Sequence, residues 1–181
     1  MNGAPMATVL PAALPDSGDR LAALFDAHYN RLYALARRMA ADAEAARDLV
    51  QETFLRAARA PASVPHGHAR EEAWLVRVLI NIRRDEWRRA EVRRRHREAS
   101  GEVPRAARDH EAAAAAREIV WRALDALPPR RRAVVVLHEL EGLTMAAVAS
   151  LLGVSAITVR WHLSRGRRDL ARLIAPLMEE P

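Results

Sequence analysis

The stretch TMAAVASLLGVSAITVRWHLSRGRR, residues 144–168, has the pattern of a helix-turn-helix. Thr144 stands where its hydroxyl can cap the first turn of one helix, and Ser155 stands in the same place before a second helix. Gly153 separates the two, and glycine readily takes the left-handed conformation that a tight helix exit needs. Apolar side chains at helical spacing give each helix a packing face. The pattern predicts two helices that cross closely at the small residue Ala149.

The second of these helices has a polar and basic outer face. Its members carry hydroxyl, aromatic, imidazole and guanidinium groups: Thr158, Arg160, Trp161, His162, Ser164, Arg165, Arg167 and Arg168. Hydroxyl and guanidinium groups hydrogen-bond to phosphates and base edges, so this face suits a DNA major groove. The alternative is an ordinary helical hairpin with a solvated basic face. Agreement of two caps, a turn glycine and the apolar spacing favours the DNA-binding motif.

The charge balance of the chain also favours a nucleic-acid partner. Its 181 residues include 29 basic residues, all arginine, and 23 acidic ones, for a formal net charge of +6. A basic excess is typical of nucleic-acid binders, although a solvated basic surface gives the same balance. The absence of cysteine excludes disulfides, thiolate metal sites and a cysteine nucleophile. No apolar run approaches the roughly 20 residues that cross a bilayer, so we expect no membrane insertion.

The sequence gives little support to an enzyme. It has no phosphate-binding glycine loop, no nucleophile elbow and no HExxH zinc motif. His66 and His68 lie together, but two histidines without a third ligand nearby are more often solvated than metal-bound. We therefore expect no catalytic residue, no cofactor and no metal.

The chain is predicted to be all-α, with two small helical domains joined by a flexible linker. Apolar residues at helical spacing cover 19–59, where Asp42 is placed to cap a second helix, and a long helix follows from about 71 to 97. Prolines and a glycine mark a loop over 60–69. Helices resume over 111–126 and 129–141. The expected divisions are a disordered tail 1–18, a first domain 19–97, a linker 98–110, a helix-turn-helix domain 111–175 and a tail 176–181.

The long middle helix combines an apolar side with a polar one. At about 100° per residue, one side gathers Leu75, Val78, Leu79 and Ile82. The other side gathers Arg77, Asn81, Arg84, Arg88 and Arg95, with Trp74 at its border. Arginines neutralise phosphates, an amide pairs with a base edge and an indole stacks on a base, so the polar side suits a nucleic-acid strand. An amphipathic surface helix with solvated arginines fits the pattern about equally well.

Three blocks of the chain resemble the extracytoplasmic-function sigma factors of bacterial RNA polymerase. DLVQETFLRAAR at 48–59 is similar to the family's region 2 helix that docks on the polymerase. AWLVRVLINIRRDEWRR at 73–89 is similar to the helix that melts and reads the −10 promoter element. LPPRRRAVVVLHELEGLTMAAVASLLGVSAITVRWHLSRGRRDL at 127–170 is similar to region 4, which reads the −35 element.

This resemblance implies roles for particular residues. Asp48, Gln51 and Glu52 are implied to contact the clamp helices of the polymerase, and they lie on the polar face of their helix as acceptors for a basic partner. The residues implied to face the melted −10 element are Trp74, Arg77 and Asn81, with Arg84 and Arg88 on the same polar side. The loop 60–70 is implied to hold a flipped base. The residues implied to read the −35 element are Thr158, Arg160, Trp161, Ser164, Arg165 and Arg168.

The implied partners are core RNA polymerase (its clamp helices and flap), promoter DNA and an anti-sigma factor, in the cytoplasm. Three sites depart from the family pattern: an aromatic is replaced by Ala58, an acidic residue by Ala147, and a small polar–basic pair by Trp161 and His162. The last change alters the recognition helix, so no promoter consensus is carried over.

Two other functions fit parts of the sequence. A stand-alone helix-turn-helix regulator with an N-terminal helical sensor would bind duplex DNA without polymerase. A sigma-like decoy would engage an anti-sigma factor instead of a promoter, but intact Arg77, Asn81 and Arg165 argue against it.

Overall fold

The computed structural model describes residues 17–99 and 112–178, and this part of the chain is helical with no strand. The helices are α1 (Ser17–Met39), α2 (Ala43–Arg59), α3 (His68–Ala99), α4 (Ala112–Asp125), α5 (Pro129–Val135), α6 (Met145–Leu152) and α7 (Ala156–Met178). A 3₁₀ turn, η1 (Pro61–Ser63), and a π-helical turn, η2 (Val136–Leu140), complete them. The all-α prediction is confirmed. Most of the expected N-terminal tail and linker lies outside the described residues.

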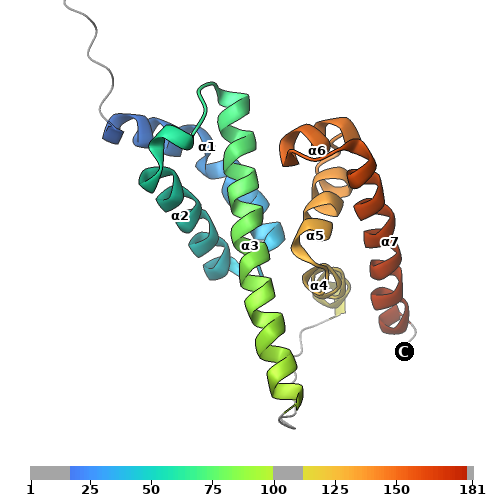
Figure 1. Ribbon diagram of the computed structural model, residues 1–181. Helices are drawn as coiled ribbons and strands as arrows, with labels where there is room; N and C mark the ends of the chain where they lie inside the picture. Colours follow the sequence, from blue (N-terminus) through green and yellow to red (C-terminus); the bar gives the residue numbers. More distant parts are fainter. Residues whose placement is uncertain (1–16, 100–111, 179–181) are drawn as a thin grey trace, which may run out of the picture.

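Helices α1, α2 and α3 pack into an N-terminal unit (Figure 1). Leu32 and Leu35 of α1, Leu49 of α2, and Leu75 and Leu79 of α3 are buried in its core. Asp42 caps α2 as predicted, accepting a hydrogen bond from the backbone N–H of Ala45 at 2.8 Å. Helix α3 is longer than predicted at both ends.

The loop between α2 and α3 is fixed to the start of α1. The Arg20 guanidinium donates to the carbonyls of Val64 at 2.8 Å and Pro65 at 3.3 Å. His66 is exposed, whereas the ring of His68 stacks on buried His28 with centroids 4.5 Å apart. Nowhere in the described ranges do three or more histidine, aspartate or glutamate side chains gather to hold a metal ion.

The C-terminal unit contains the predicted helix-turn-helix. The Thr144 hydroxyl accepts from the Ala147 N–H at 3.2 Å, and the Ser155 hydroxyl accepts from the Thr158 N–H at 3.1 Å. Gly153 ends α6 in the left-handed conformation, with φ of 64°. These three local signals place α6 and α7 where the sequence predicted them. The π-helical turn η2 at the end of α5 and the continuation of α7 to Met178 were not predicted.

Two packing features join the C-terminal helices to one another and to α3. Gly166 of α7 is buried against α5, where an added Cβ would lie 2.5 Å from Val135 Cγ2. Figure 1 shows α3 between the α1–α2 pair and the C-terminal helices, and α3 contacts both α5 and α6.

Within 17–99 and 112–178 no single helix is long and apolar enough to cross a membrane; α6 and α7 together reach that composition only as a pair bent by 108°.

Candidate polymerase and nucleic-acid interfaces

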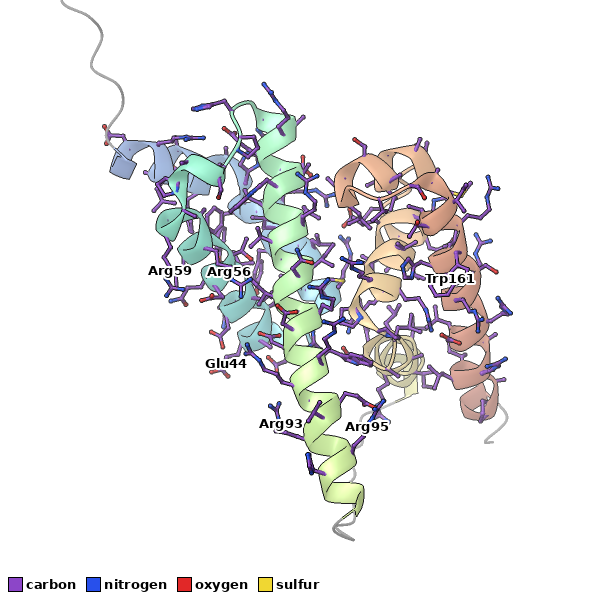
Figure 2. The ribbon with its side chains drawn as sticks, in the orientation of Figure 1. Glu44, Arg56, Arg59, Arg93, Arg95 and Trp161 are labelled. Carbon is purple, nitrogen blue, oxygen red and sulfur yellow. The ribbon has the colours of Figure 1, made fainter. Side chains whose placement is uncertain are left out.

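Helix α2 has an exposed polar face beside an apolar groove. Asp48 and Gln51 are exposed, whereas Glu52 is half-buried and pairs with Arg56 at 3.2 Å and Arg59 at 3.6 Å. Figure 2 shows the two arginines on the outer side of α2. The polar face predicted for polymerase contact is therefore accessible, and Asp48 and Gln51 are its acceptors that have no partner within 17–99 and 112–178.

The apolar groove beside this face was missed by sequence reasoning. Its lining residues come from α1 and α2: Leu21, Phe25, Tyr29, Arg47, Val50, Gln51, Phe54, Leu55 and Ala58. Phe25 is 42% exposed and Leu55 is 40% exposed, although both are large apolar residues. The ring of Phe25 lies 4.8 Å from that of Tyr29 and 4.9 Å from that of Phe54. Ala58 also lines the groove.

The polar side of α3 is covered in this structure. Arg77 and Asn81 are half-buried and face a cavity of about 210 Å³ between the two units. The cavity is lined by Arg77, Ile80 and Asn81 of α3 and by Arg130, Val134, Leu152, Val154 and His162 of the C-terminal unit. Cations and an amide line it, and no carboxylate does.

The apolar side of α3 is also broader than predicted. Leu75, Leu79 and Ile82 are buried as expected, but Val78 is only half-buried, and Val76 and Ile80 are buried too. The apolar face expected from the sequence is thus too narrow, because α3 packs against helices on two sides. Helical spacing alone cannot reveal a second packing partner.

The remaining residues predicted on this polar side do not gather around Asn81. Trp74 is half-buried and packs against the hydrophobic core. Arg84 pairs with Asp85 at 3.4 Å, and Arg88 is exposed. Arg77 and Asn81 are therefore the two predicted −10 residues that the structure brings to one place.

The outer face of α7 is open to solvent. Arg160, Ser164, Arg165 and Arg168 are exposed, and Trp161 is 51% exposed (Figure 2). The guanidinium carbons of Arg131 and Arg165 lie 5.9 Å and 5.8 Å from the centre of the Trp161 ring, within cation–π distance. On the exposed side of α7, Trp161 therefore lies within cation–π distance of two arginines.

Two residues assigned to the outer face of α7 do not lie fully there. Thr158 is half-buried and its hydroxyl is 2.9 Å from that of Ser155, so it belongs to the cap. His162 is half-buried, lines the cavity, and its Nδ1 has no hydrogen-bond partner in the described structure. Burial, with the positive charges of Arg131 and Arg130, lowers the pKa of His162. Its placement on a solvent face was wrong because that side of α7 faces α5 and the cavity shared with α3.

The order of these faces along the chain matches a known family. Residues 24–94 match sigma-70 region 2, and residues 117–170 match sigma-70 region 4. The chain is 36% identical over 163 residues to the ECF RNA polymerase sigma factor SigM of Mycobacterium tuberculosis, covering 89% of this chain and 81% of that protein. The chain belongs to the extracytoplasmic-function sigma factors. It is also 34% identical to SigL of the same species, covering 91% of this chain and 94% of SigL.

Solved sigma-factor structures have a similar fold. CnrH in complex with the cytosolic domain of CnrY matches with a TM-score of 0.56 and 25% identity, covering 86% of this chain and 88% of that one. RpoE from Bartonella quintana, in complex with the anti-sigma factor NepR, matches with a TM-score of 0.58 and 23% identity, covering 90% and 98%. In this sigma factor, region 2 therefore includes the covered face of α3, and region 4 includes the open face of α7.

Proposed function

We propose that this sigma factor binds core RNA polymerase and directs promoter-specific transcription initiation. In this proposal α7 reads duplex DNA at the −35 element, and α3 reads and opens the −10 element. The chain acts by binding and DNA deformation in the cytoplasm, without a cofactor, while the polymerase performs the chemistry. The observation that carries the proposal is the separation of two DNA-suited faces onto region 2 and region 4, with a third surface on α2 left for a protein partner.

The α2 surface suits the polymerase because it combines free acceptors with exposed apolar groups. Asp48 and Gln51 make no hydrogen bond or ion pair within the described part of the chain, and Phe25 and Leu55 border them with exposed apolar surface. Interfaces of this kind place apolar contacts centrally and charge-assisted hydrogen bonds around them. We propose that Asp48, Gln51 and Glu52 contact the clamp helices, and that region 4 contacts the flap.

The recognition face of α7 suits the −35 element because its donors are exposed. Arg160, Arg165 and Ser164 are exposed on one side of α7, beside Trp161. Guanidinium groups can bind phosphates or pair in a bidentate manner with guanine, and an indole can pack against a thymine methyl or a sugar. The complexes of CnrH with CnrY and of RpoE with NepR support the further proposal that an anti-sigma factor binds this chain.

Reconstitution tests the function directly. Sigma-free core polymerase and the full chain are supplied with a genomic DNA library, and transcript starts are mapped. The proposal predicts discrete starts that depend on both proteins. Duplex binding that is indifferent to polymerase, with no starts, would instead identify a stand-alone helix-turn-helix regulator.

Charge reversal tests the docking surface. Asp48→Arg combined with Glu52→Arg should weaken core binding by about 1–3 kcal/mol, because charge-assisted contacts are replaced by repulsion. A matched control reverses Glu86 and Glu139, which are exposed on α3 and η2. Affinity is measured by fluorescence titration and helical content by circular dichroism. If both double variants bind core as the parent does, the α2 face is not the docking site.

A further inference from the structure

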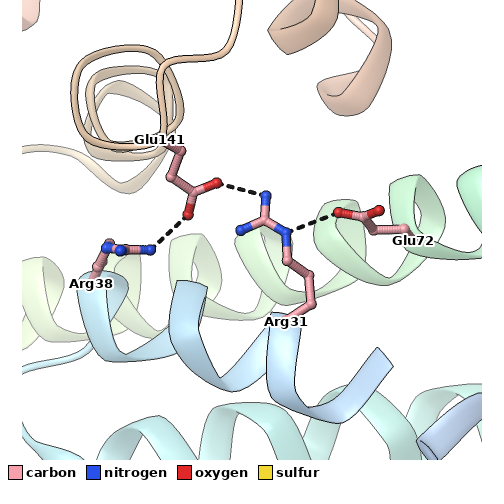
Figure 3. Close-up of polar contacts among 4 residues, drawn as sticks. All are labelled: Arg31, Arg38, Glu72 and Glu141. Atoms are coloured by element: carbon pink, nitrogen blue, oxygen red, sulfur yellow. Dashed lines mark hydrogen bonds and ion pairs between the residues drawn. The ribbon is translucent and has the colours of Figure 1, made fainter. Parts of the chain in front are cut away.

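Region 4 is tied to region 2 by a buried carboxylate. Glu141, which follows η2, is only 7% exposed and lies between two arginines of α1 (Figure 3). Its Oε2 accepts from Arg31 Nη2 at 2.6 Å, and its Oε1 accepts from Arg38 Nη1 at 2.9 Å. Arg31 Nε also donates to Glu72 of α3 at 3.0 Å. We call Glu141, Arg31 and Arg38 the clasp; it links the two units of the chain.

A second tie involves a buried arginine of α5. Arg132 is 2% exposed, and its Nε donates to the carbonyl of Arg38 at 2.7 Å while its Nη2 donates to that of Ala40 at 3.4 Å. These carbonyls lie at the C-terminal end of α1, where a cation is favoured by the helix dipole. Asp125 pairs with the same guanidinium and balances its charge. The contact between the units is therefore specific in geometry.

This contact covers the side chains that the proposed function gives to the −10 strand. Arg77 and Asn81 are half-buried and line the cavity of about 210 Å³ between the two units. That volume is below the roughly 300–1,000 Å³ of ordinary small-ligand pockets, so the cavity is too small to hold a DNA strand. Gly153, in the turn of the helix-turn-helix, lies so close that an added Cβ would be 3.3 Å from Arg77 Cδ. Region 4 must move away before α3 can receive single-stranded DNA.

We propose that the clasp makes the free chain autoinhibited: Glu141, held by Arg31 and Arg38, keeps region 4 over the −10 face of α3. The proposal rests on the function assigned above to Arg77 and Asn81. The clasp is suited to release because its two arginines are 34% and 35% exposed, so water can solvate them as they separate. A partner that separates the two units would expose the −10 face.

The distance between the two units can be measured on the full chain alone. The chain has no cysteine, so Arg59→Cys on α2 and Arg172→Cys on α7 give a specific pair for single-molecule energy transfer. Without DNA or polymerase, Glu141→Ala should shift molecules from a compact to an extended population. Glu139→Ala is the matched control, because Glu139 pairs with Arg167 within region 4, at 2.6 Å.

Accessibility of the −10 face is the second measurement. Binding of mixed-sequence single-stranded DNA to the polymerase-free chain should be about tenfold tighter for Glu141→Ala, because apparent affinity scales with the open fraction. Adding Asn81→Ala should remove that gain. Arg31→Ala with Arg38→Ala repeats the test from α1 and serves in place of Glu141→Ala if that variant loses helical content.

The results separate the clasp from the function. If the clasp variants match Glu139→Ala in both distance and single-strand affinity, the clasp proposal is overturned. A gain in affinity that survives Asn81→Ala contradicts it as well, because the exposed surface is then not the −10 face. If the distances change as expected but core polymerase and the parent chain give no transcript starts, the proposed function fails while the clasp as an interdomain lock stands.

Discussion

The polar sides of α3 and α7 have similar chemistry but opposite accessibility. Arg77 and Asn81 of α3 are half-buried beneath region 4, whereas Arg160 and Arg165 of α7 are exposed, with Trp161 within cation–π distance of Arg165. Helix α3 packs against other helices on two sides, whereas α7 leaves one side exposed. The comparison teaches that residue type alone does not decide when a DNA-suited face can act. We expect the free chain to bind duplex DNA more readily than single strands.

The largest loss of stability should come from removing the buried guanidinium of Arg132, which ties region 4 to the end of α1. Arg132→Ala should lower the free energy of unfolding by about 3 kcal/mol, because it leaves the carbonyls of Arg38 and Ala40 and the Asp125 carboxylate without their partner. Arg167→Ala, which breaks an exposed pair with Glu139, should cost less than about 1 kcal/mol. Urea unfolding measures both. Equal losses of unfolding free energy in the two variants would mean that Arg132 does not hold region 4 against α1.

A smaller loss of stability is expected at the contact between α7 and α5, which orients the exposed face of α7. Gly166→Ala should destabilise the chain by about 1–3 kcal/mol, because the new methyl would overlap Val135. Gly18→Ala, with nothing within 4 Å, should be neutral or stabilising, since alanine is the better helix former. Thermal unfolding of the two variants compares them. Stabilisation by both would show that α7 can shift away from α5.

The sequence predicted what local interactions decide. Asp42, Thr144 and Ser155 cap helices through bonds to residues three positions away, and such signals can be read from the chain. The clasp could not be predicted, because Arg31 and Glu141 are 110 residues apart. The wrong placement of His162 has the same origin: helical spacing gives a residue's direction but not the element that covers it.

The smallest effect concerns His162, which lies on α7 between its exposed face and the side that lines the cavity with α3. Its pKa is lowered in the fold, so the unfolded chain takes up the proton first as the pH falls. The stability that this residue contributes is present above about pH 6.5 and lost as the pH falls towards its folded pKa. Between about pH 7.5 and pH 5.5 the parent should lose more melting temperature than His162→Gln, by about 2 °C at most.

The control for that comparison is His66→Gln, because His66 is exposed in the loop before α3. It should lose as much melting temperature as the parent on acidification. If the melting temperatures of the parent and of His162→Gln depend on pH in the same way, His162 lies in solvent. The exposed face of α7 would then include His162.

The central claim is that α7 binds duplex DNA while α3 opens it. Permanganate footprinting of unpaired thymines, on a promoter mapped with core polymerase, tests this together with duplex affinity across a salt series. Arg165→Ala should weaken duplex binding and lower its salt slope by about one. Asn81→Ala should leave duplex binding unchanged and reduce thymine reactivity. If Asn81→Ala opens the promoter as the parent does while Arg165→Ala keeps its duplex affinity, the division of work between the two helices is wrong.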